Sequence, residues 1–418
     1  MKPSSRFLLS GLAAAANTAN AIKPAARFGR ASLPSFAFGV VPSEWPTQTG
    51  LVQAATATLL ARHDGLKGWK GALGVAAYGA SFAGLAYMHR EAGKAGAIME
   101  QALVDELGHD YRRRITESLV PKPEVPLTRQ QLLLPDVAVR RRFRHARNLS
   151  YGEHGVRNQL DIWRRADLPL DGKAPVLFQV HGGAWVVGMK EGQAETMMSL
   201  LAERGWVIVT INYRLSPRST WPDHIVDVKK ALAWTKANIA QYGGDPDFVA
   251  ITGGSAGGHL ASLAAVTPNL AEFQPGFEDA DTTVQAGVPF YGIYDFVNRH
   301  GTSRPDMDVL LGKQVFKSRM ANDQARWEQA SPISHIGPHV PPMFMLHGVN
   351  DSLVPVEQTR TFVEELRKES TNHVVYAELP GAQHAFEILP SIRSYAAAHA
   401  VERFLAVVRS EHQAATAR

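Results

Sequence analysis

Beyond residue 126, short apolar runs rich in valine, isoleucine and aromatic residues alternate with longer stretches of helical period. This alternation predicts a mostly parallel central sheet flanked by helices. We expect strands at 176–180, 206–212, 248–252, 288–291, 343–346 and 374–379, and helices near 191–204, 224–242, 256–266, 356–368 and 391–408. Because ligands of such sheets bind at the carboxyl ends of the strands, catalytic residues are expected directly after these runs.

The N-terminal part of the chain contains one long run without charge. Residues 71–88 lie between Lys70 and His89 and carry no charged side chain. The run approaches the ~20 residues that span a bilayer, but four glycines and many alanines keep its hydrophobicity low. We therefore predict a helix that is buried or lies at an interface, with a membrane span as the alternative.

Residues 1–30 match the three-part plan of a secretory leader loosely. Lys2 and Arg6 precede a short apolar run at 7–16, and Ala19-Asn20-Ala21 follows it. An acid-free leader of this kind also resembles a transit peptide or an amphipathic helix. Location therefore stays open between the cytoplasm and a membrane-associated or cell-envelope site reached through this region.

Three prolines, at 121, 123 and 126, interrupt the helical pattern and predict a linker. The expected organisation is a mainly helical N-terminal region at 1–125 and a catalytic domain at 126–418. Within that domain, the stretch 294–331 is long for a connection. With its helix-like part near 319–327, it is expected to form a helical cap over the substrate pocket.

The net charge of +5 comes from the N-terminal tail. No acidic residue precedes Glu44, whereas five basic residues do, which leaves 44 − 5 = 39 basic against 39 acidic residues in the rest of the chain. A neutral body argues against a nucleic-acid partner. A local arginine cluster at 140–142, 144 and 147 is interpreted as a solvated face. The absence of cysteine excludes disulfides, zinc–thiolate sites and a cysteine nucleophile.

A nucleophile-elbow motif, Gly253-Gly254-Ser255-Ala256-Gly257-Gly258, stands between the strand expected at 248–252 and the helix expected at 256–266. In a G-x-S-x-G elbow, the glycines allow a strained turn that presents the serine hydroxyl. The pentapeptide alone is moderately specific, because such a turn also packs a helix on a sheet or cradles a phosphate. Ser255 stands where the phosphate-binding fingerprint requires its middle glycine, which argues against that alternative.

A second motif, His181-Gly182-Gly183-Ala184-Trp185, directly follows the strand expected at 176–180, where an oxyanion-hole loop is expected. Attack on an ester carbonyl creates a tetrahedral oxyanion, and each fixed backbone donor aimed at it contributes roughly 100- to 1000-fold in rate. On its own, the motif fits a simple turn that contains a histidine equally well. In combination with the nucleophile-elbow motif downstream, it favours a catalytic loop.

Two further candidates complete a catalytic triad. Asp351 follows the strand expected at 343–346, and His384 follows the strand expected at 374–379. The chain order serine, aspartate, histidine is the order that this fold uses. Ser255 is therefore the predicted nucleophile, His384 the base and Asp351 the group that orients the histidine.

Other titratable residues fit structural roles. Asp223, His224 and Asp227 are interpreted as helix-start and surface residues, and Asp245 and Asp247 as turn residues. No H-E-x-x-H, P-loop or EF-hand spacing is present, so we expect neither a metal nor another cofactor.

These motifs resemble the hormone-sensitive-lipase-like carboxylesterases of the α/β-hydrolase superfamily over about residues 145–410. The family hallmarks HGGGW, YRL-x-P and G-x-SAGG correspond here to 181–185, 213–217 and 253–258. The run 291–384 is similar to actinobacterial esterases that carry an extra N-terminal region. Two departures are Ala184, in place of the third glycine, and the context of Asp351, which is more similar to feruloyl esterases and oligopeptidase-type hydrolases.

The resemblance implies an α/β-hydrolase fold and backbone donors at Gly183, Ala184 and Ala256, with Gly182 shaping the loop of the oxyanion hole. It also implies a serine carboxylic-ester hydrolase, an esterase or lipase that acts on small acyl esters through an acyl-enzyme. The alternatives are an amide-cleaving relative such as an arylformamidase, a non-catalytic binding protein of the same fold, and a membrane-tethered lipase anchored by 71–88. The sequence does not predict oligomeric state.

Overall fold

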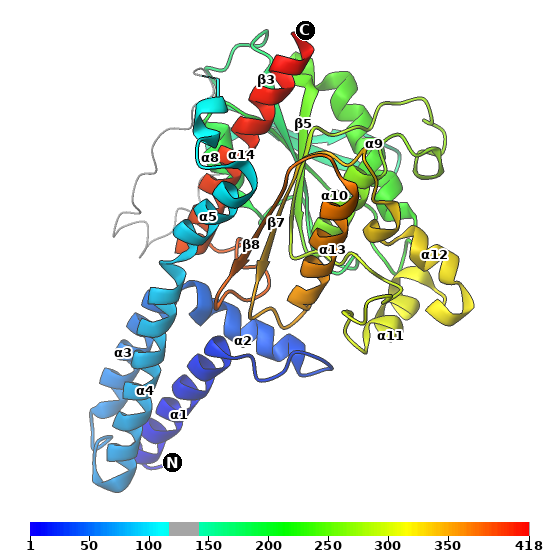
Figure 1. Ribbon diagram of the computed structural model, residues 1–418. Coiled ribbons are helices and arrows are strands. Elements are labelled where there is room, and N and C mark those ends of the chain that lie inside the picture. Colours follow the sequence, from blue (N-terminus) through cyan, green and yellow to red (C-terminus); the bar gives the residue numbers. More distant parts are fainter. Residues whose placement is uncertain (117–141, 418) are drawn as a thin grey trace.

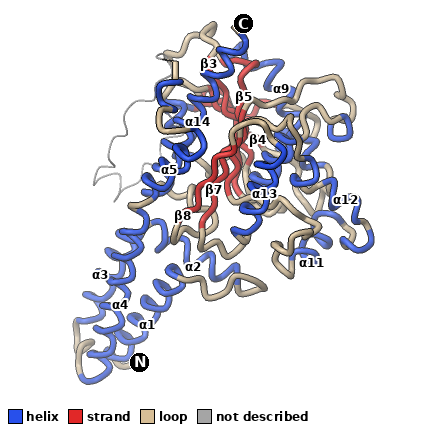
Figure 2. Tube along the Cα trace, in the orientation of Figure 1, coloured by secondary structure: helices blue, strands red, loops and turns tan. Residues whose placement is uncertain are grey.

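The computed structural model describes residues 1–116 and 142–417, and its centre is an eight-stranded sheet (Figures 1 and 2). The strands are β1 (Arg144–Ser150), β2 (Gln159–Trp163), β3 (Ala174–Val180), β4 (Val207–Ile211), β5 (Gly244–Gly254), β6 (Ala286–Phe290), β7 (Met343–Gly348) and β8 (Val374–Leu379). Their order is β1-β2-β4-β3-β5-β6-β7-β8, parallel from β4 to β8. The predicted mostly parallel sheet is confirmed.

The two strands at one edge were not predicted. β1 pairs antiparallel with β2, and β2 pairs antiparallel with β4. The six predicted strands are all present, and their buried, nearly continuous apolar runs are typical of a sheet covered on both faces.

Helices cover both faces of the sheet (Figure 1). One apolar cluster joins the sheet to α9 (Asp223–Asn238), α10 (Ala256–Val266) and α13 (Val356–Glu369). A second joins the opposite face to α5 (Ala95–Leu107), α8 (Glu195–Glu203) and α14 (Ile392–Thr416). Because α5 packs on the sheet through Met99 and Leu103, both fully buried, the N-terminal part of the chain already joins the catalytic core at this helix.

Four helices precede α5, namely α1 (Pro3–Ile22), α2 (Ser32–Glu44), α3 (Pro46–Ala61) and α4 (Gly68–Ala92). Helices α1, α3 and α4 form a bundle that projects from the α/β body, with the N-terminus at its far end (Figure 1). The uncharged run 71–88 lies on α4. The predicted linker at 121–126 and the arginines at 140 and 141 lie outside the described residues.

The stretch 294–331 contains two short helices, α11 (Met307–Leu311) and α12 (Gln324–Gln329). The helix expected near 319–327 therefore begins later, at Gln324. The ring of Phe316 stacks on Trp327 with centroids 4.3 Å apart, and Phe296 lies 5.6 Å from Trp185. The stretch thus packs beside the loop at 181–185.

A buried ion pair joins α2 to the α/β body. Arg393 Nη1 lies 3.1 Å from Glu44 Oε1, and both side chains are fully buried. Ser391 Oγ donates to Glu44 Oε2 at 2.9 Å, and Arg393 Nη1 donates to the Ser43 carbonyl at 2.9 Å. Since Arg393 Nη2 also donates to the Pro380 carbonyl, the pair fixes the end of α2 beside the loop that follows β8.

Replacing Glu44 by alanine is expected to destabilise the protein by about 3–5 kcal/mol, because the Arg393 guanidinium would stay buried without its charged partner. Urea unfolding of the full chain measures the loss. The matched control is Glu357→Ala, which removes a pair with Arg360 whose side chains are about half exposed and should change stability by less than about 1 kcal/mol. Equal losses in the two variants would contradict the assignment.

Candidate active site

Ser255 occupies a strained turn between the central strand β5 and helix α10. Its backbone has φ 59° and ψ −121°, a left-handed conformation that a non-glycine residue rarely adopts. The glycine spacing has a steric cause: a Cβ on Gly257 would lie 2.2 Å from the Val180 carbonyl oxygen, and one on Gly253 would lie 2.5 Å from the Gly257 backbone. The elbow therefore brings the start of α10 directly against the end of β3.

Asp351 and His384 meet from the loops after β7 and β8. His384 Nδ1 lies 2.6 Å from Asp351 Oδ2, and both side chains are buried. Because an ionised carboxylate only accepts hydrogen bonds, the imidazole carries its proton on Nδ1 and donates it to Asp351. The other ring nitrogen, Nε2, then carries no proton and is free to accept one.

The Asp351 carboxylate is held in its ionised form. Its Oδ1 accepts the Leu353 and Val354 amides at 2.8 and 2.7 Å, and its Oδ2 lies 3.1 Å from His347 Nε2. Burial alone would raise the pKa of Asp351, but His384 and the hydrogen bonds from both histidines hold this pKa below its ordinary value. An anion therefore faces His384 at neutral pH.

Tyr291 places the serine loop beside the histidine loop. The Ser255 amide donates to the Phe290 carbonyl at 3.0 Å, at the end of β6. The ring of Tyr291, the next residue, lies 4.5 Å from the His384 ring. Ser255 and His384 thus flank the same two-residue segment.

The loop at 181–185, predicted to form an oxyanion hole, has a strained backbone. Gly183, Ala184 and Trp185 have φ values of 123°, 52° and 60°, three successive residues in left-handed conformations. In the described part of the chain, the amides of Gly183, Ala184 and Ala256 donate to no protein oxygen. Strained backbone with unpaired donors beside a candidate nucleophile is typical of a functional loop.

Gly182 has a different part in this loop. Its amide donates to Gln193 Oε1 at 2.7 Å and is not free to bind an oxyanion. A Cβ at Gly182 would lie 2.6 Å from the Gly254 carbonyl oxygen and 3.2 Å from Ser255 Cβ. Gly182 therefore shapes the loop and lets it approach the serine.

His181 anchors the start of the loop at 181–185 through its contacts with Tyr213. Its ring is fully buried and stacks on Tyr213 with centroids 4.3 Å apart, and the Tyr213 hydroxyl donates to the His181 carbonyl at 3.0 Å. Burial lowers the pKa of His181 to about 4, which keeps the ring neutral. This histidine is structural.

The interpretation of His224 and Asp227 as surface residues was wrong, because both are buried. Asp227 accepts the Arg214 amide and guanidinium at 2.8–3.0 Å, and Asp223, which is partly exposed, pairs with the same arginine at 2.9 Å. The stretch at 213–217 therefore supplies Arg214 as the counter-ion of the buried Asp227, which spacing alone did not reveal. His224 lies 3.1 Å from Ser216 Oγ. None of these residues reaches the triad through a hydrogen bond.

Sequence reasoning missed two residues next to the triad, Phe36 and Glu387. The ring of Phe36, on α2, meets the His384 ring edge-on with centroids 5.9 Å apart. The Glu387 carboxylate is buried and accepts a hydrogen bond from the Tyr291 hydroxyl. Glu387 follows His384 by three residues in a loop, so spacing offered one weak signal for it, whereas nothing in the sequence linked Phe36 to the site.

Burial raises the pKa of Glu387 to about 7, against the lowering effect of the Tyr291 hydrogen bond. A raised pKa in the folded state gives stability that is present below pH 4.5 and lost as the pH rises through 7. Replacing Glu387 by glutamine should remove this loss, which is on the order of 3 kcal/mol at most. The Tm difference between variant and wild type should therefore grow by a few degrees from pH 5 to pH 8. Glu153→Gln, at an exposed position, is the control, and a difference independent of pH would refute this account of Glu387.

Across residues 1–116 and 142–417, no group of three or more His, Cys, Asp or Glu side chains is placed to hold a metal ion.

The BD-FAE family matches residues 160–366. The probable carboxylic ester hydrolase LipM of Mycobacterium tuberculosis is 51% identical over 407 residues, which cover 96% of this chain and 92% of LipM. Esterase LipQ of the same organism is 46% identical and covers 75% of each chain. Since the LipM match leaves out only 4% of this chain, it includes most of the N-terminal helices.

Among solved structures, esterase 2 of Thermogutta terrifontis, phosphonylated by sarin, is similar to this chain with a TM-score of 0.50 and 25% identity. The match covers 56% of this chain and 84% of that esterase. The matched part has the α/β-hydrolase fold, and a large part of this chain has no counterpart in that esterase.

Proposed function

This chain belongs to the carboxylic ester hydrolases of the α/β-hydrolase fold that include LipM, and from that membership we propose that it cleaves acyl esters through a triad of Ser255, His384 and Asp351. The observation that carries the proposal is the strained backbone of Ser255 at the turn from β5 to α10. Such strain persists only where surrounding structure imposes it, and here it presents a hydroxyl at the carboxyl end of the central strand.

In the first half of the reaction, His384 Nε2 takes the hydroxyl proton as Ser255 Oγ attacks the ester carbonyl carbon. Asp351 holds the Nδ1 proton and stabilises the imidazolium that forms. The negative charge that develops on the carbonyl oxygen is bound by the amides of Gly183, Ala184 and Ala256. The intermediate collapses as His384 donates its proton to the leaving alcohol, which leaves Ser255 acylated.

In the second half, water replaces the alcohol. His384 takes a proton from the water as its oxygen attacks the acyl carbon, and the same amides bind the second oxyanion. Collapse returns the proton to Ser255 Oγ and releases the carboxylic acid. Atoms balance as one ester and one water giving one alcohol and one acid.

The test is turnover of a nitrophenyl acyl series by the purified full chain beside turnover of formyl-kynurenine. Hydrolysis of the esters with little or no cleavage of the formamide is the expected result. Preferential cleavage of formyl-kynurenine would assign an arylformamidase instead, and no turnover of either substrate would favour a binding protein. The ester series also reports which acyl length the pocket prefers.

A further inference from the structure

The projecting bundle of α1, α3 and α4 contains a network of buried polar side chains. Thr18 and Ser81 are almost fully buried, and Thr18 Oγ1 lies 2.8 Å from Ser81 Oγ. Ser81 Oγ also lies 2.8 Å from Gln53 Oε1, and Ser10 Oγ lies 2.7 Å from the Tyr78 hydroxyl. Small polar groups that bond across helices are typical of helix packing within a membrane.

The outer surface of the same bundle is apolar. Its exposed large apolar residues are Leu9, Leu12, Leu51, Val52, Leu59, Leu73, Val75 and Phe82, each between 37% and 67% exposed. In a water-soluble protein, side chains of this size are mostly buried, and exposed apolar patches mark an interaction surface. Phe7, Leu85 and Met88 are also buried, but a buried polar network beneath so many exposed apolar side chains is unusual for a water-soluble bundle.

Glycines bring α1 and α4 into close contact. A Cβ on Gly11 would lie 2.8 Å from the Gly74 carbonyl oxygen, one on Gly74 would lie 2.5 Å from the Phe7 ring, and one on Gly84 would lie 2.6 Å from Thr18. Close approach through small residues is how helices associate in lipid, where the hydrophobic effect supplies no force between them.

Each of the three helices carries an uncharged band of similar length. The bands are 7–22, 45–61 and 71–88, with 16, 17 and 18 residues. At 1.5 Å per residue they measure roughly 24–27 Å, close to the ~30 Å hydrocarbon core of a bilayer. Basic residues flank them: Arg6, Arg62 and Lys70 at the far end, and Lys23 and Arg90 near the body. Long basic side chains reach headgroups from slightly short spans.

We propose that α1, α3 and α4 form a membrane-spanning bundle, with the apolar exterior in the hydrocarbon core and the basic flanks among anionic headgroups on both sides. Among the described residues, one helical stretch, Gly68–Leu107, which contains α4, is long and apolar enough by itself to cross a membrane, and 33% of its most apolar 18-residue window is buried. The spans of α1 and α3 rest on their packing against α4. The first expectation for 71–88, a helix that is buried or lies at an interface, accounts for the side of α4 that faces α1 and α3, and the exposed side fits the alternative, a membrane span.

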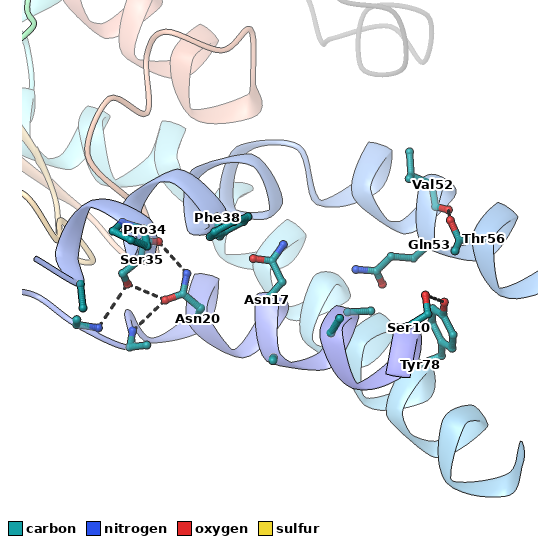
Figure 3. Close-up of a pocket in the computed structure, with 16 residues that line it drawn as sticks. Ser10, Asn17, Asn20, Pro34, Ser35, Phe38, Val52, Gln53, Thr56 and Tyr78 are labelled. Atoms are coloured by element: carbon teal, nitrogen blue, oxygen red, sulfur yellow. Dashed lines mark hydrogen bonds between the residues drawn. The ribbon is translucent and has the colours of Figure 1, made fainter. Parts of the chain in front are cut away.

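A groove of about 710 Å³ opens on this exterior between α1, α2 and α3 (Figure 3). Alanines and the exposed side chains of Phe38 and Val52 form much of its wall, and Asn17 and Gln53 point into it (Figure 3). In a bilayer the groove would open to acyl chains.

The bundle ends at the active site. Asn350, which precedes Asp351, donates to the Ala21 and Ile22 carbonyls at the end of α1 at 3.1 and 2.8 Å. On the proposed function, the triad then faces the membrane surface, and its substrates are esters whose acyl chains dissolve in the bilayer. Phe36 of α2, the helix that also contributes Pro34, Ser35 and Phe38 to the groove, contacts the His384 ring edge-on.

The chain lacks cysteine, so single cysteines test this topology cleanly. Val75→Cys lies in the middle of the band, Lys67→Cys at the far end, and Val156→Cys on the catalytic domain. Val75 and Val156 are matched valines, 54% and 65% exposed. Each full-length variant is expressed in cells, and a membrane-impermeant maleimide is added to spheroplasts or to inverted vesicles. Turnover of a short soluble ester, measured on every variant, shows separately whether the catalytic domain is folded and active.

The proposal expects the protein to stay in the membrane after carbonate washing. Lys67→Cys and Val156→Cys should react from opposite sides, and Val75→Cys should react at least tenfold more slowly than Val156→Cys until detergent is added. Release by carbonate, labelling of both ends from one side, or equal rates at the two valines would overturn it. Soluble dimers cross-linked through Val75→Cys would identify a second copy as the partner of this surface and would also overturn it. None of these results would affect the proposed ester-hydrolase function as long as the variants still cleave the short soluble ester.

Discussion

Replacing Ser255 by alanine is expected to lower kcat for ester hydrolysis by a factor on the order of 10⁵ to 10⁶, because the variant has no oxygen to form the acyl-enzyme. Alanine keeps the Cβ, so the strain at φ 59° and the packing of α10 should be unchanged. The residual rate reflects the oxyanion donors and substrate binding alone. Steady-state turnover of the preferred nitrophenyl ester, with active protein quantified by circular dichroism, measures the loss.

Ser262→Ala is the matched control, because Ser262 is a buried serine on the same helix, seven residues further along. Its activity should stay within a few fold of wild type. If both variants lost activity to the same degree, the effect would come from damage to α10 and not from loss of the nucleophile.

Replacing Asp351 by asparagine should lower kcat by a factor of about 10⁴. An asparagine oxygen in the Oδ1 position still accepts the Leu353 and Val354 amides, so the loop after β7 keeps its shape. Its amide nitrogen then faces His384 Nδ1 and donates to it, which moves the imidazole proton to Nε2. With Nε2 protonated, the ring cannot accept the Ser255 proton.

The pH profile separates this mechanism from simple destabilisation. Loss of the carboxylate should lower the apparent pKa of kcat/KM for Asp351→Asn, since the imidazolium loses its counter-charge. Asp247→Asn, at an exposed aspartate near the opposite end of β5, should keep the wild-type rate and profile. An Asp351→Asn variant within tenfold of wild type would remove Asp351 from the triad.

The parallel part of the fold was predictable from the sequence, because buried parallel strands are continuous apolar runs. The same reasoning placed Ser255, Asp351 and His384 after the carboxyl ends of three strands, and their role as a triad stays a proposal. The edge strands were not predictable. β1 has the sequence RHARNLS, in which Ala146 and Leu149 are the only apolar residues. β2 contains the buried Asp161, and Lys190 Nζ lies 3.2 Å from its Oδ1. Since the two residues are nearly thirty positions apart, no local sequence pattern indicates this pair.

Contacts between distant segments account for the other omissions. Phe36 contacts His384 because α2 packs on the α/β body, where Glu44 at the end of α2 pairs with Arg393. These two residues are nearly 350 positions apart in the sequence. The pKa of Glu387 is raised only because Tyr291 and the surrounding core bury its carboxylate in the folded protein. In the same way, a sequence shows that 71–88 lacks charge, whereas the inward position of Thr18 and Ser81 is visible only once the helices are assembled.

The most direct test of the central claim is to map the covalent adduct of a fluorophosphonate on the native full-length protein by mass spectrometry. Phosphonates react with an activated serine and mimic the tetrahedral intermediate. The account predicts one adduct per chain, on the peptide that contains Ser255, absent from Ser255→Ala and from denatured protein. An adduct on a different residue, or undiminished labelling of Ser255→Ala, would contradict it.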